Sequence, residues 1–260
     1  MVKFVRGGGM EIHKPKPWHG LREFLKEYLI IVAGVLTALA GEQAVEAIHW
    51  THEAEKTTQA LSDELAASAA QATERIALED CLRERIGQLT AKLNNSDGEW
   101  VADPMLLGVA RASAAIRPGM PFVYRAPNRG WADDAWQAAR STGMINHLER
   151  AQVASYGRAY GNVSELGSLQ IEEARLAPKL AFLGYDQRLD NASRVNALTI
   201  LGELDYVNSK MALSSRVLVS IAKAQHLNFD RKTLARTMQE TFAAQRRLRG
   251  NCVGRMPLEF

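Results

Sequence analysis

The residue pair that most resembles a metal-binding motif is Glu46 and His49, which are separated by two residues. On a helix this spacing places a carboxylate and an imidazole on the same face, as in di-iron bundles that use a Glu-x-x-His pair from each of two helices. Such a site requires a second pair on a facing helix, and the sequence contains none. We therefore predict no metal and no cofactor, and we interpret His49 as a polar residue near a membrane surface.

No other group of residues predicts catalysis. The six histidines occur outside any metal or nucleophile motif, and no serine lies in a G-x-S-x-G turn. The acidic pair of Glu172 and Glu173 falls in a helical pattern, where a solvated face is the default interpretation. The sequence therefore favours a protein that is not an enzyme.

The segment between Arg117 and Trp136 combines aromatic and arginine side chains, which binding surfaces use more than other residue types. Its candidate binding residues are Arg117, Phe122, Tyr124, Arg125, Arg129 and Trp131. Two interpretations are open. The segment presents these side chains to a partner or substrate, or its rings fill the end of a helical domain while its arginines pair with acidic residues elsewhere in the chain.

The distribution of charge favours the second interpretation and argues against a nucleic-acid partner. Residues 42–99 hold 12 acidic and 5 basic residues, whereas residues 100–260 hold 14 acidic and 21 basic residues. The two parts therefore carry opposite charges that attract each other. The formal net charge of +3 resides in residues 1–27, which hold six basic and three acidic residues. The excess positive charge thus belongs to a short leader.

Cys81 and Cys252 are the two cysteines of the chain. They form a disulfide that closes a loop of about 170 residues, or they remain two buried thiols. The disulfide requires an oxidising compartment.

A long run without charged residues, YLIIVAGVLTALAG, covers residues 28–41. As a helix this run spans about 21 Å, which is short of the roughly 30 Å hydrocarbon layer of a bilayer. Continued to Trp50, the helix spans about 33 Å and has an aromatic ring at each end. We therefore predict a transmembrane helix over residues 28–50, with the lipid bilayer as its partner.

Basic residues concentrate on the N-terminal side of this run, so the positive-inside rule predicts a cytoplasmic N-terminus and a periplasmic domain over residues 51–260. Residues 1–27 form a cytoplasmic leader with an interfacial turn. Met10 is a candidate start, in which case residues 1–9 lie upstream of the protein. One alternative stays open: Ala38-Leu39-Ala40 is a signal-peptidase site, and cleavage there would release the domain.

Small and polar residues recur every four residues along the predicted span. This stripe comprises Gly34, Ala38, Glu42 and Glu46. Small residues allow another helix to approach closely, and a polar group on the same side can form a hydrogen bond across the contact. The stripe predicts self-association or a protein partner. The alternative is that the Glu42 side chain extends to the nearby membrane interface and the small residues have no special role.

From Met10 onward the chain also resembles a known family. The segment EIHKPKPWHGLREFLKEYLIIVAGVLTALAGEQAVEAIHW is similar to the opening of a family of uncharacterised bacterial, mostly proteobacterial, membrane-anchored proteins. In that family a Lys-Pro-rich leader, a single span and an E-Q-A-V-E exit precede a helical domain. The resemblance covers residues 10–60, and residues 135–161 more loosely. It implies an N-terminally anchored helical protein and supplies no catalytic residue.

Beyond residue 50 the apolar residues recur at helical spacing, and a chain of 260 residues with 47% hydrophobic residues is long enough to bury a core. Helices are predicted over 53–93, 105–116, 133–163 with a break near Gly143, 195–225 and 231–248. We expect an all-α fold in which the transmembrane helix continues into an antiparallel bundle of four or five helices. Asn208, inside an apolar stripe, either sets the register of that bundle or faces solvent.

These observations predict a non-enzymatic, single-pass inner-membrane protein whose periplasmic bundle acts as a binding or accessory subunit of a membrane or envelope complex. Two alternatives remain open. The bundle is a periplasmic ligand-binding or sensory module, or it is an enzyme with a site near residues 117–136.

Overall fold

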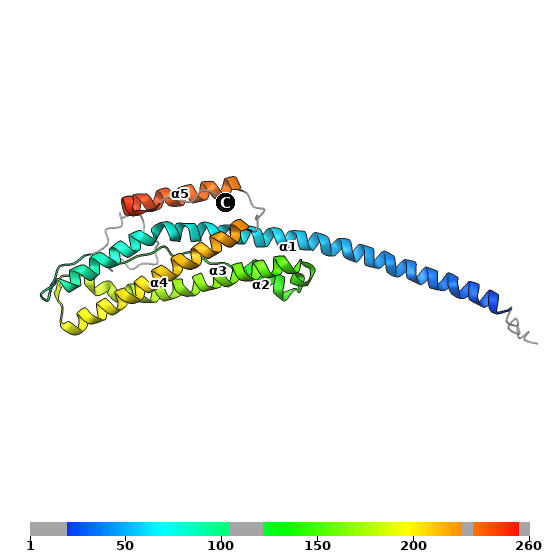
Figure 1. Cartoon of the computed structure of the whole chain (residues 1–260), viewed down its shortest axis with the longest axis horizontal. Coiled ribbons are helices and arrows are strands. Elements are labelled where there is room, and N and C mark those ends of the chain that lie inside the picture. Colours follow the sequence, from blue (N-terminus) through cyan, green and yellow to red (C-terminus); the bar gives the residue numbers. More distant parts are fainter. Residues whose placement is uncertain (1–19, 104–121, 225–230, 255–260) are drawn as a thin grey trace, which may run out of the picture. The chain divides into compact units, whose positions relative to one another are not determined.

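The structure is a computed structural model that describes residues 20–103, 122–224 and 231–254 (Figure 1). This part of the chain is built almost entirely from helices, which confirms the predicted all-α class. Its five α-helices are α1 (Leu21–Asn94), α2 (Asp134–Ser141), α3 (Arg150–Leu176), α4 (Asn191–Ala224) and α5 (Arg231–Arg249). Two compact units, Met1–His52 and Glu53–Phe260, are described separately. The predicted leader before Gly20 and the predicted helix over 105–116 lie outside the described residues.

Helix α1 supplies the described structure of the first unit and then contributes to the second. Near the N-terminus it contains an 18-residue window with a mean hydropathy of 1.7, of which nothing is buried. By length and composition, α1 can therefore cross a membrane. It ends at Asn94, one residue beyond the predicted helix end at residue 93, and Gly98 then takes a φ of 106°, a left-handed conformation that favours glycine.

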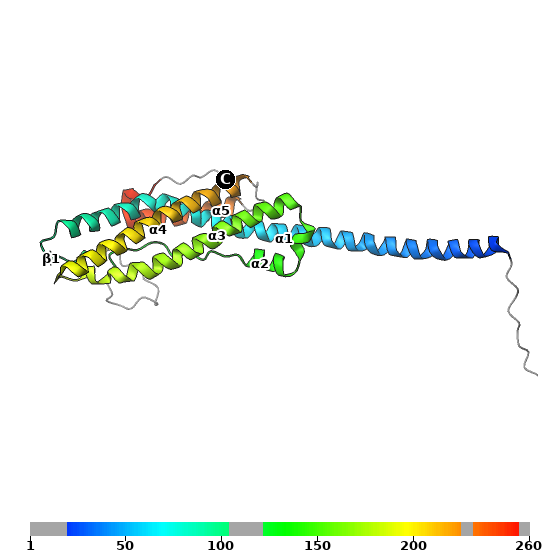
Figure 2. The same cartoon turned by 60° about the horizontal axis from the view of Figure 1, so that its bottom comes forward.

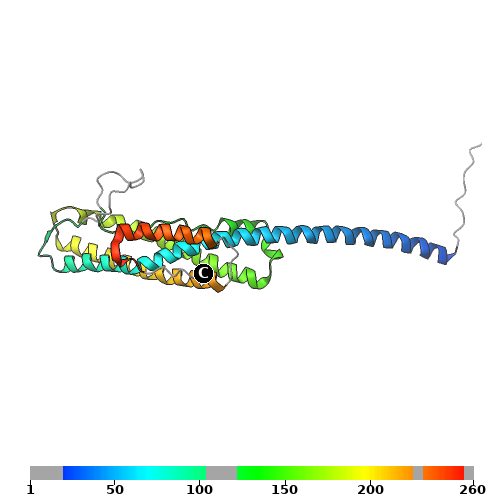
Figure 3. The ribbon, with the colours of Figure 1, turned by 90° about the horizontal axis from the view of Figure 1, so that it is seen from above.

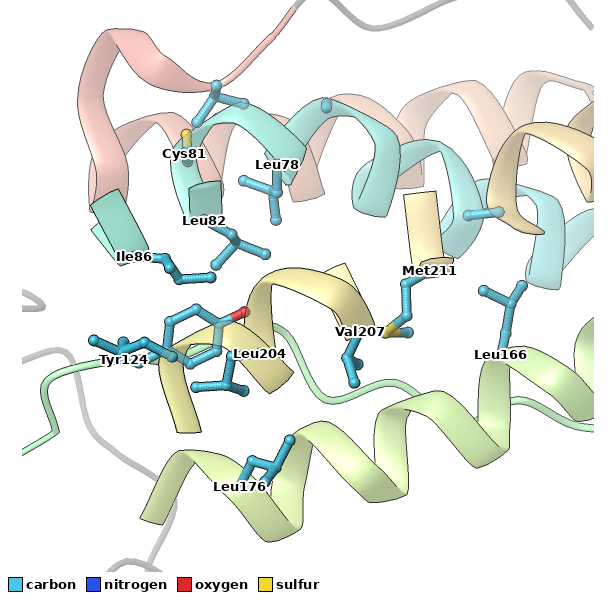
Figure 4. Close-up of a cluster of buried hydrophobic side chains, with 14 of the residues drawn as sticks. Leu78, Cys81, Leu82, Ile86, Tyr124, Leu166, Leu176, Leu204, Val207 and Met211 are labelled. Carbon is cyan, nitrogen blue, oxygen red and sulfur yellow. The ribbon is translucent and has the colours of Figure 1, made fainter. Parts of the chain in front are cut away.

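The core of the second unit forms where the apolar stripes of α1, α3 and α4 meet (Figure 4). The labelled side chains of this core are Leu78, Cys81, Leu82, Ile86, Tyr124, Leu166, Leu176, Leu204, Val207 and Met211. On α1 and α4 they recur mainly every three or four residues, which keeps them on one face of each helix. Each fully buried leucine contributes about 1.5–3 kcal/mol relative to an exposed one.

Hydrogen bonds between the helices define their directions. The Tyr160 hydroxyl of α3 donates to the carbonyl of Leu61 on α1 at 3.2 Å, and further along both helices Glu173 pairs with Arg75. Helices α1 and α3 therefore run in the same direction, whereas α4 runs opposite to both (Figure 1, Figure 2). The expected antiparallel arrangement thus describes α3 and α4 but not α1 and α3.

The parallel arrangement arises because the chain returns along the bundle between α1 and α2. Trp100 Nε1 donates to the carbonyl of Leu183 at 2.7 Å, beyond the C-terminal end of α3. At residue 135 the chain lies at the opposite end of the second unit, where the Ala135 amide donates to Glu64 of α1 at 3.1 Å. We call residues 122–136 the return segment. Because of this crossover, α3 begins at the end of the second unit that holds the first residues of α1 in that unit.

Local signals explain the breaks between the helices. Gly143, with a φ of 75°, separates α2 from the 3-10 helix η1 (Met144–His147), at the predicted break. The Glu149 amide donates to the Gln152 side chain at 3.3 Å at the start of α3, which satisfies a helix-end donor. Pro178 lies in the 3-10 helix η2 (Ala177–Gly184), where its missing amide ends the α-helical pattern of α3.

One feature was not expected from the sequence. Strands β1 (Glu99–Trp100) and β2 (Gln187–Arg188) form a two-residue antiparallel ladder in which Glu99 lies opposite Arg188. So short a ladder has no alternating apolar pattern to reveal it.

The C-terminal part of the chain is tied to α1 (Figure 3). Cys81 and Cys252 form a disulfide across a sequence separation of 171, so the structure contains the first of the two alternatives for the cysteines. Cys252 lies in the 3-10 helix η3 (Gly250–Cys252). Just after it, the Gly254 amide donates to the carbonyl of Ala77 at 2.8 Å, and a Cβ at position 254 would lie 3.3 Å from that oxygen. Glycine therefore permits this close approach.

Replacing Cys81 by alanine together with Cys252 by serine is expected to lower the free energy of unfolding by about 2–4 kcal/mol, because the unfolded chain regains the entropy of an open loop. Urea unfolding of the detergent-solubilised chain, followed by tryptophan fluorescence, measures the change. Reduced wild-type protein is the control and should match the double variant. An unchanged midpoint for both would show that the crosslink contributes nothing.

Candidate functional site

The predicted contact stripe lies in the first unit. Gly34, Ala38, Glu42 and Glu46 are exposed on α1, and a Cβ at Gly34 would meet no other atom within 4 Å. The Glu46 carboxylate accepts a hydrogen bond of 3.2 Å from Trp50 Nε1, one turn further along. The small residues of the stripe thus leave open space beside the helix.

The second unit buries a group of polar side chains that we call the Arg75 cluster, comprising Arg75, Tyr124, Glu173 and Asn208. Arg75 of α1 donates twice to Glu173 of α3, from Nη1 to Oε2 at 2.9 Å and from Nη2 to Oε1 at 2.6 Å. The two side chains are only 4% and 5% exposed. Charges at this depth are tolerated only when they are paired and hydrogen-bonded. The pair therefore requires α1 and α3 to meet in one register.

The other two members of the Arg75 cluster come from the return segment and from α4. The Tyr124 hydroxyl donates to Glu173 Oε1 at 2.7 Å. Asn208 accepts a bond from Arg75 Nη2 at 3.3 Å and donates to the carbonyl of Glu79 at 3.2 Å. Asn208 therefore faces the core rather than solvent. It ties α4 to the same level of α1 as the ion pair.

The surroundings of the Arg75 cluster shift two of its pKa values. Burial raises the pKa of the Tyr124 hydroxyl, and the negative charge of Glu173 raises it further. Burial alone would lower the pKa of Arg75, but the charge and hydrogen bonds of Glu173 outweigh this effect and the pKa is raised. The cluster thus keeps a neutral phenol next to a charged guanidinium–carboxylate pair.

A second group, which we call the Glu74 cluster, joins the return segment and α5 to α1. Arg129 donates from Nε and Nη2 to the Glu74 carboxylate, each at 2.7 Å, and Gln245 of α5 donates to Glu74 Oε1 at 2.9 Å. Arg249 donates to Gln245 at 3.1 Å and to the carbonyl of Arg125 at 2.6 Å. Burial lowers the pKa of Arg249. One arginine of the basic C-terminal run is therefore part of the folded bundle.

Gln170 of α3 holds the return segment in place. Its Oε1 accepts hydrogen bonds from the Arg129 amide at 2.8 Å and from the Trp131 indole at 3.2 Å, and its Nε2 donates to the Arg129 carbonyl at 2.6 Å. These bonds satisfy the backbone of an irregular segment that has no ladder or helix partner.

The predicted binding residues Phe122, Tyr124, Arg125, Arg129 and Trp131 all fall in the return segment, whereas Arg117 lies outside the described residues. Tyr124 is buried and Trp131 packs against the core, while Arg129 forms the ion pair of the Glu74 cluster. The Arg125 guanidinium lies 5.8 Å from the centre of the Phe122 ring. The described part of the segment thus has rings against the bundle and an arginine on an acidic residue of α1.

Both clusters suit a structural role better than a chemical one. Arg75 is ion-paired with Glu173 and Arg129 with Glu74, and both carboxylates are withdrawn from solvent. Across residues 20–103, 122–224 and 231–254, no group of three or more His, Cys, Asp or Glu side chains could hold a metal ion. The described side chains of the two clusters hold the helices together.

The expectation that no serine lies in a catalytic motif, S-x-x-K included, was wrong in one respect, because Ser220 and Lys223 have the S-x-x-K spacing of some serine acyl-transfer enzymes. Both side chains are exposed near the C-terminal end of α4. A nucleophilic serine needs a base within hydrogen-bond reach and donors aimed at the developing oxyanion. The structure shows neither for Ser220 in the described residues, so the pair remains a match in spacing alone.

A scan of protein-family models gave no match to this chain, and neither did searches of curated proteins and of solved structures. The site is therefore interpreted from its own geometry.

The sequence pattern placed Glu173 on a solvated face. This interpretation was wrong, because Glu173 is only 4% exposed. Its spacing offered a signal, since Leu166 and Leu176 lie seven residues before it and three after it on the buried face of α3. Arg75 likewise lies between buried residues of α1, three residues after Ala72. A charged residue at core spacing on each of two helices indicates a buried pair. The sequence alone does not say which two residues meet.

Replacing Glu173 by glutamine is expected to lower the free energy of unfolding by about 3–5 kcal/mol, because Arg75 would keep a buried charge without its partner. Glu172→Gln is the matched control, because its ion pair with Arg175 lies at the surface and contributes little. Urea unfolding compares the two variants. Equal effects would mean that the buried pair has no special role.

The stability of the bundle is expected to fall at alkaline pH. Burial raises the pKa of Tyr124 and of Tyr160 above the ordinary tyrosine value of 10.0, so the folded chain retains two protons that the unfolded chain releases. The stabilisation is complete below pH 10 and is lost above it, by about 1.4 kcal/mol per pH unit for each tyrosine. Urea unfolding between pH 9 and about 11.5 measures this slope. The variant with phenylalanine at both positions should show a shallower slope, and an identical slope would refute the assignment.

Proposed function

We propose that this chain is a single-pass protein of the bacterial inner membrane with a cytoplasmic N-terminus. Residues 28–50 of α1 would cross the bilayer. The bundle would lie in the periplasm, where it acts as a non-enzymatic binding or accessory subunit of a membrane or envelope complex.

The observation that carries this proposal is a contrast between two parts of α1. In the second unit, its apolar side chains occupy one buried face. In the first unit, large apolar side chains surround the helix and are exposed, namely Leu29, Ile30, Ile31, Val35, Leu36, Leu39, Val45 and Ile48. A helix that is apolar on all sides needs an apolar environment, and exposing it to water costs about 25 cal/mol per Å². A lipid bilayer supplies that environment.

Two independent features support the proposed compartment. Basic residues concentrate before the apolar segment, which favours a cytoplasmic N-terminus. The disulfide between Cys81 and Cys252 favours an oxidising compartment for the bundle, such as the periplasm. Both features support the same orientation.

A binding or accessory role agrees with the character of the interior. The charged side chains of the Arg75 and Glu74 clusters are used to join helices. Chemistry would have to occur at the surface, where no catalytic group has been identified among the described residues. Contacts made by the outer faces of the helices are therefore the function that this architecture supports best.

Fractionation of bacteria that express the full chain tests the anchor and its orientation. We expect the chain to stay in the membrane during alkaline carbonate extraction, and protease to digest the bundle in spheroplasts but not in intact cells. Recovery of a chain that begins at Gly41 would replace the anchor by a cleaved signal peptide. A bundle that resists protease in spheroplasts but not in lysed cells would reverse the orientation.

A matched pair of variants sharpens this test. Lysine at both Leu36 and Leu39 should deplete the chain from the membrane, because each central lysine costs about 2.5–3.5 kcal/mol on insertion. Lysine at Gln59, an exposed position of α1 in the second unit, should leave the distribution unchanged. Purification of the wild-type membrane protein in mild detergent then examines the accessory role, since a stoichiometric partner supports it and recovery of a lone monomer contradicts it.

A further inference from the structure

Helix α4 has two apolar stripes on opposite sides. One faces the core and includes Leu204 and Met211. The other faces outward, and we call it the outer stripe; its members are Val195, Gly202, Tyr206, Ser209, Leu213 and Val217, all exposed. Tyr206 is 63% exposed and Leu213 52% exposed, which is unusual for large apolar side chains. The outer stripe is therefore a surface without a partner in the described part of the chain.

The spacing and sizes of the outer stripe suit another helix. From Gly202 to Leu213 its members recur alternately every four and three residues, the repeat by which two helices pack side by side. Tyr206 lies between two small residues, Gly202 and Ser209. A Cβ at Gly202 would meet no other atom within 4 Å, so space for a neighbouring side chain exists there. The Tyr206 ring can therefore fill a space on a facing helix, and the small residues on either side of it leave room for a side chain of that helix.

Two charged residues flank the outer stripe on opposite sides. At 3.6 residues per turn, Asp205 falls on one side of Tyr206 and Lys210 on the other. Both residues are partly exposed, and no ion pair joins Asp205 to another described residue. No ion pair joins Lys210 to another described residue. A carboxylate and an ammonium separated by five residues occupy the positions that pair between parallel helices of a coiled coil.

We propose that two copies of this chain associate through the outer stripe, with their α4 helices parallel. Asp205 of each copy pairs with Lys210 of the other, and Tyr206 of each copy packs between Gly202 and Ser209 of the other. Because the arrangement is twofold symmetric, each contact occurs twice.

The charges favour the parallel over the antiparallel direction. An antiparallel pair would bring Glu203 of one copy to Lys210 of the other. That arrangement would leave Asp205, on the other flank of the outer stripe, without Lys210 as its partner. The parallel arrangement instead pairs Asp205 with Lys210 on both flanks of the interface, so it joins the two charged residues that border the outer stripe.

The inference rests on the proposed function in one respect. Two chains anchored in the same membrane are held at a raised effective concentration, which allows a small interface to form a dimer. The test is therefore made in membranes of cells that express the full chain.

Cysteine substitution at Ser209 tests the pairing. In the parallel arrangement each Ser209 faces its counterpart, so S209C should form a crosslinked dimer under mild oxidation, seen at twice the chain mass on a non-reducing gel. S168C is the matched control, because Ser168 is also an exposed serine of a long helix, α3, away from the outer stripe. We expect at least about tenfold less crosslinked dimer for S168C, since random collision does not distinguish the two positions.

Charge reversal tests the proposed partners. In the S209C background, D205K or K210D alone should lower the crosslinked fraction about three- to tenfold, because each replaces two attractive contacts by repulsive ones. The double variant D205K/K210D should restore it. A double variant as poor as the single variants would overturn the assignment of the pair.

The remaining outcomes separate this proposal from the membrane anchor. A chain in the membrane fraction whose S209C variant stays monomeric overturns the α4 pairing and leaves the anchor intact. A crosslink to a different protein also overturns self-pairing, because the occupant is then another chain. A chain found in the soluble fraction contradicts the anchor, and its S209C crosslink in that fraction still decides the pairing.

Discussion

The ion pair between Arg75 and Glu173 constrains nearly every other contact of the bundle. Each charge loses its hydration on burial, and the loss is offset only while the partner stays within hydrogen-bond distance. A shift of α1 against α3 by one turn, about 5.4 Å, would leave both groups uncompensated. Tyr124 and Asn208 donate to or accept from the same pair, so the return segment and α4 are held at the same level. The register of four separate parts of the chain therefore depends on one guanidinium.

The complementary charges of the two parts of the chain explain only some of the contacts. An acidic residue of α1 pairs with a later arginine at Glu74 with Arg129 and at Glu79 with Arg216. The direction is reversed at Arg75 with Glu173, the most deeply buried of the described ion pairs. Net charge describes long-range attraction between segments, whereas burial selects individual partners by geometry. For this reason the overall charge predicted that the parts attract each other but did not predict the central pair.

Much of the helical structure could be predicted from the sequence, because periodicity and turn residues act locally. The stop at Asn94, the break at Gly143 and the extents of α4 and α5 follow from residues within one or two turns. The parallel direction of α1 and α3 could not be predicted in this way. It depends on the course of the return segment, which Gln170 holds through bonds to a backbone some 40 residues earlier. Such contacts leave no periodic trace in the sequence.

The two stripes of α4 also show how much of a surface can be predicted from sequence pattern alone. Its core stripe is rich in leucine and methionine and stands out in the sequence. The outer stripe mixes Tyr206 and Leu213 with glycine and serine, so its mean hydropathy is low and the pattern alone resembles an ordinary solvent-facing surface. Only the burial of the first stripe shows that the second points away from the core. Asp205 and Lys210, which border the outer stripe and form no ion pair in the described structure, then support the proposal that this stripe is a contact surface.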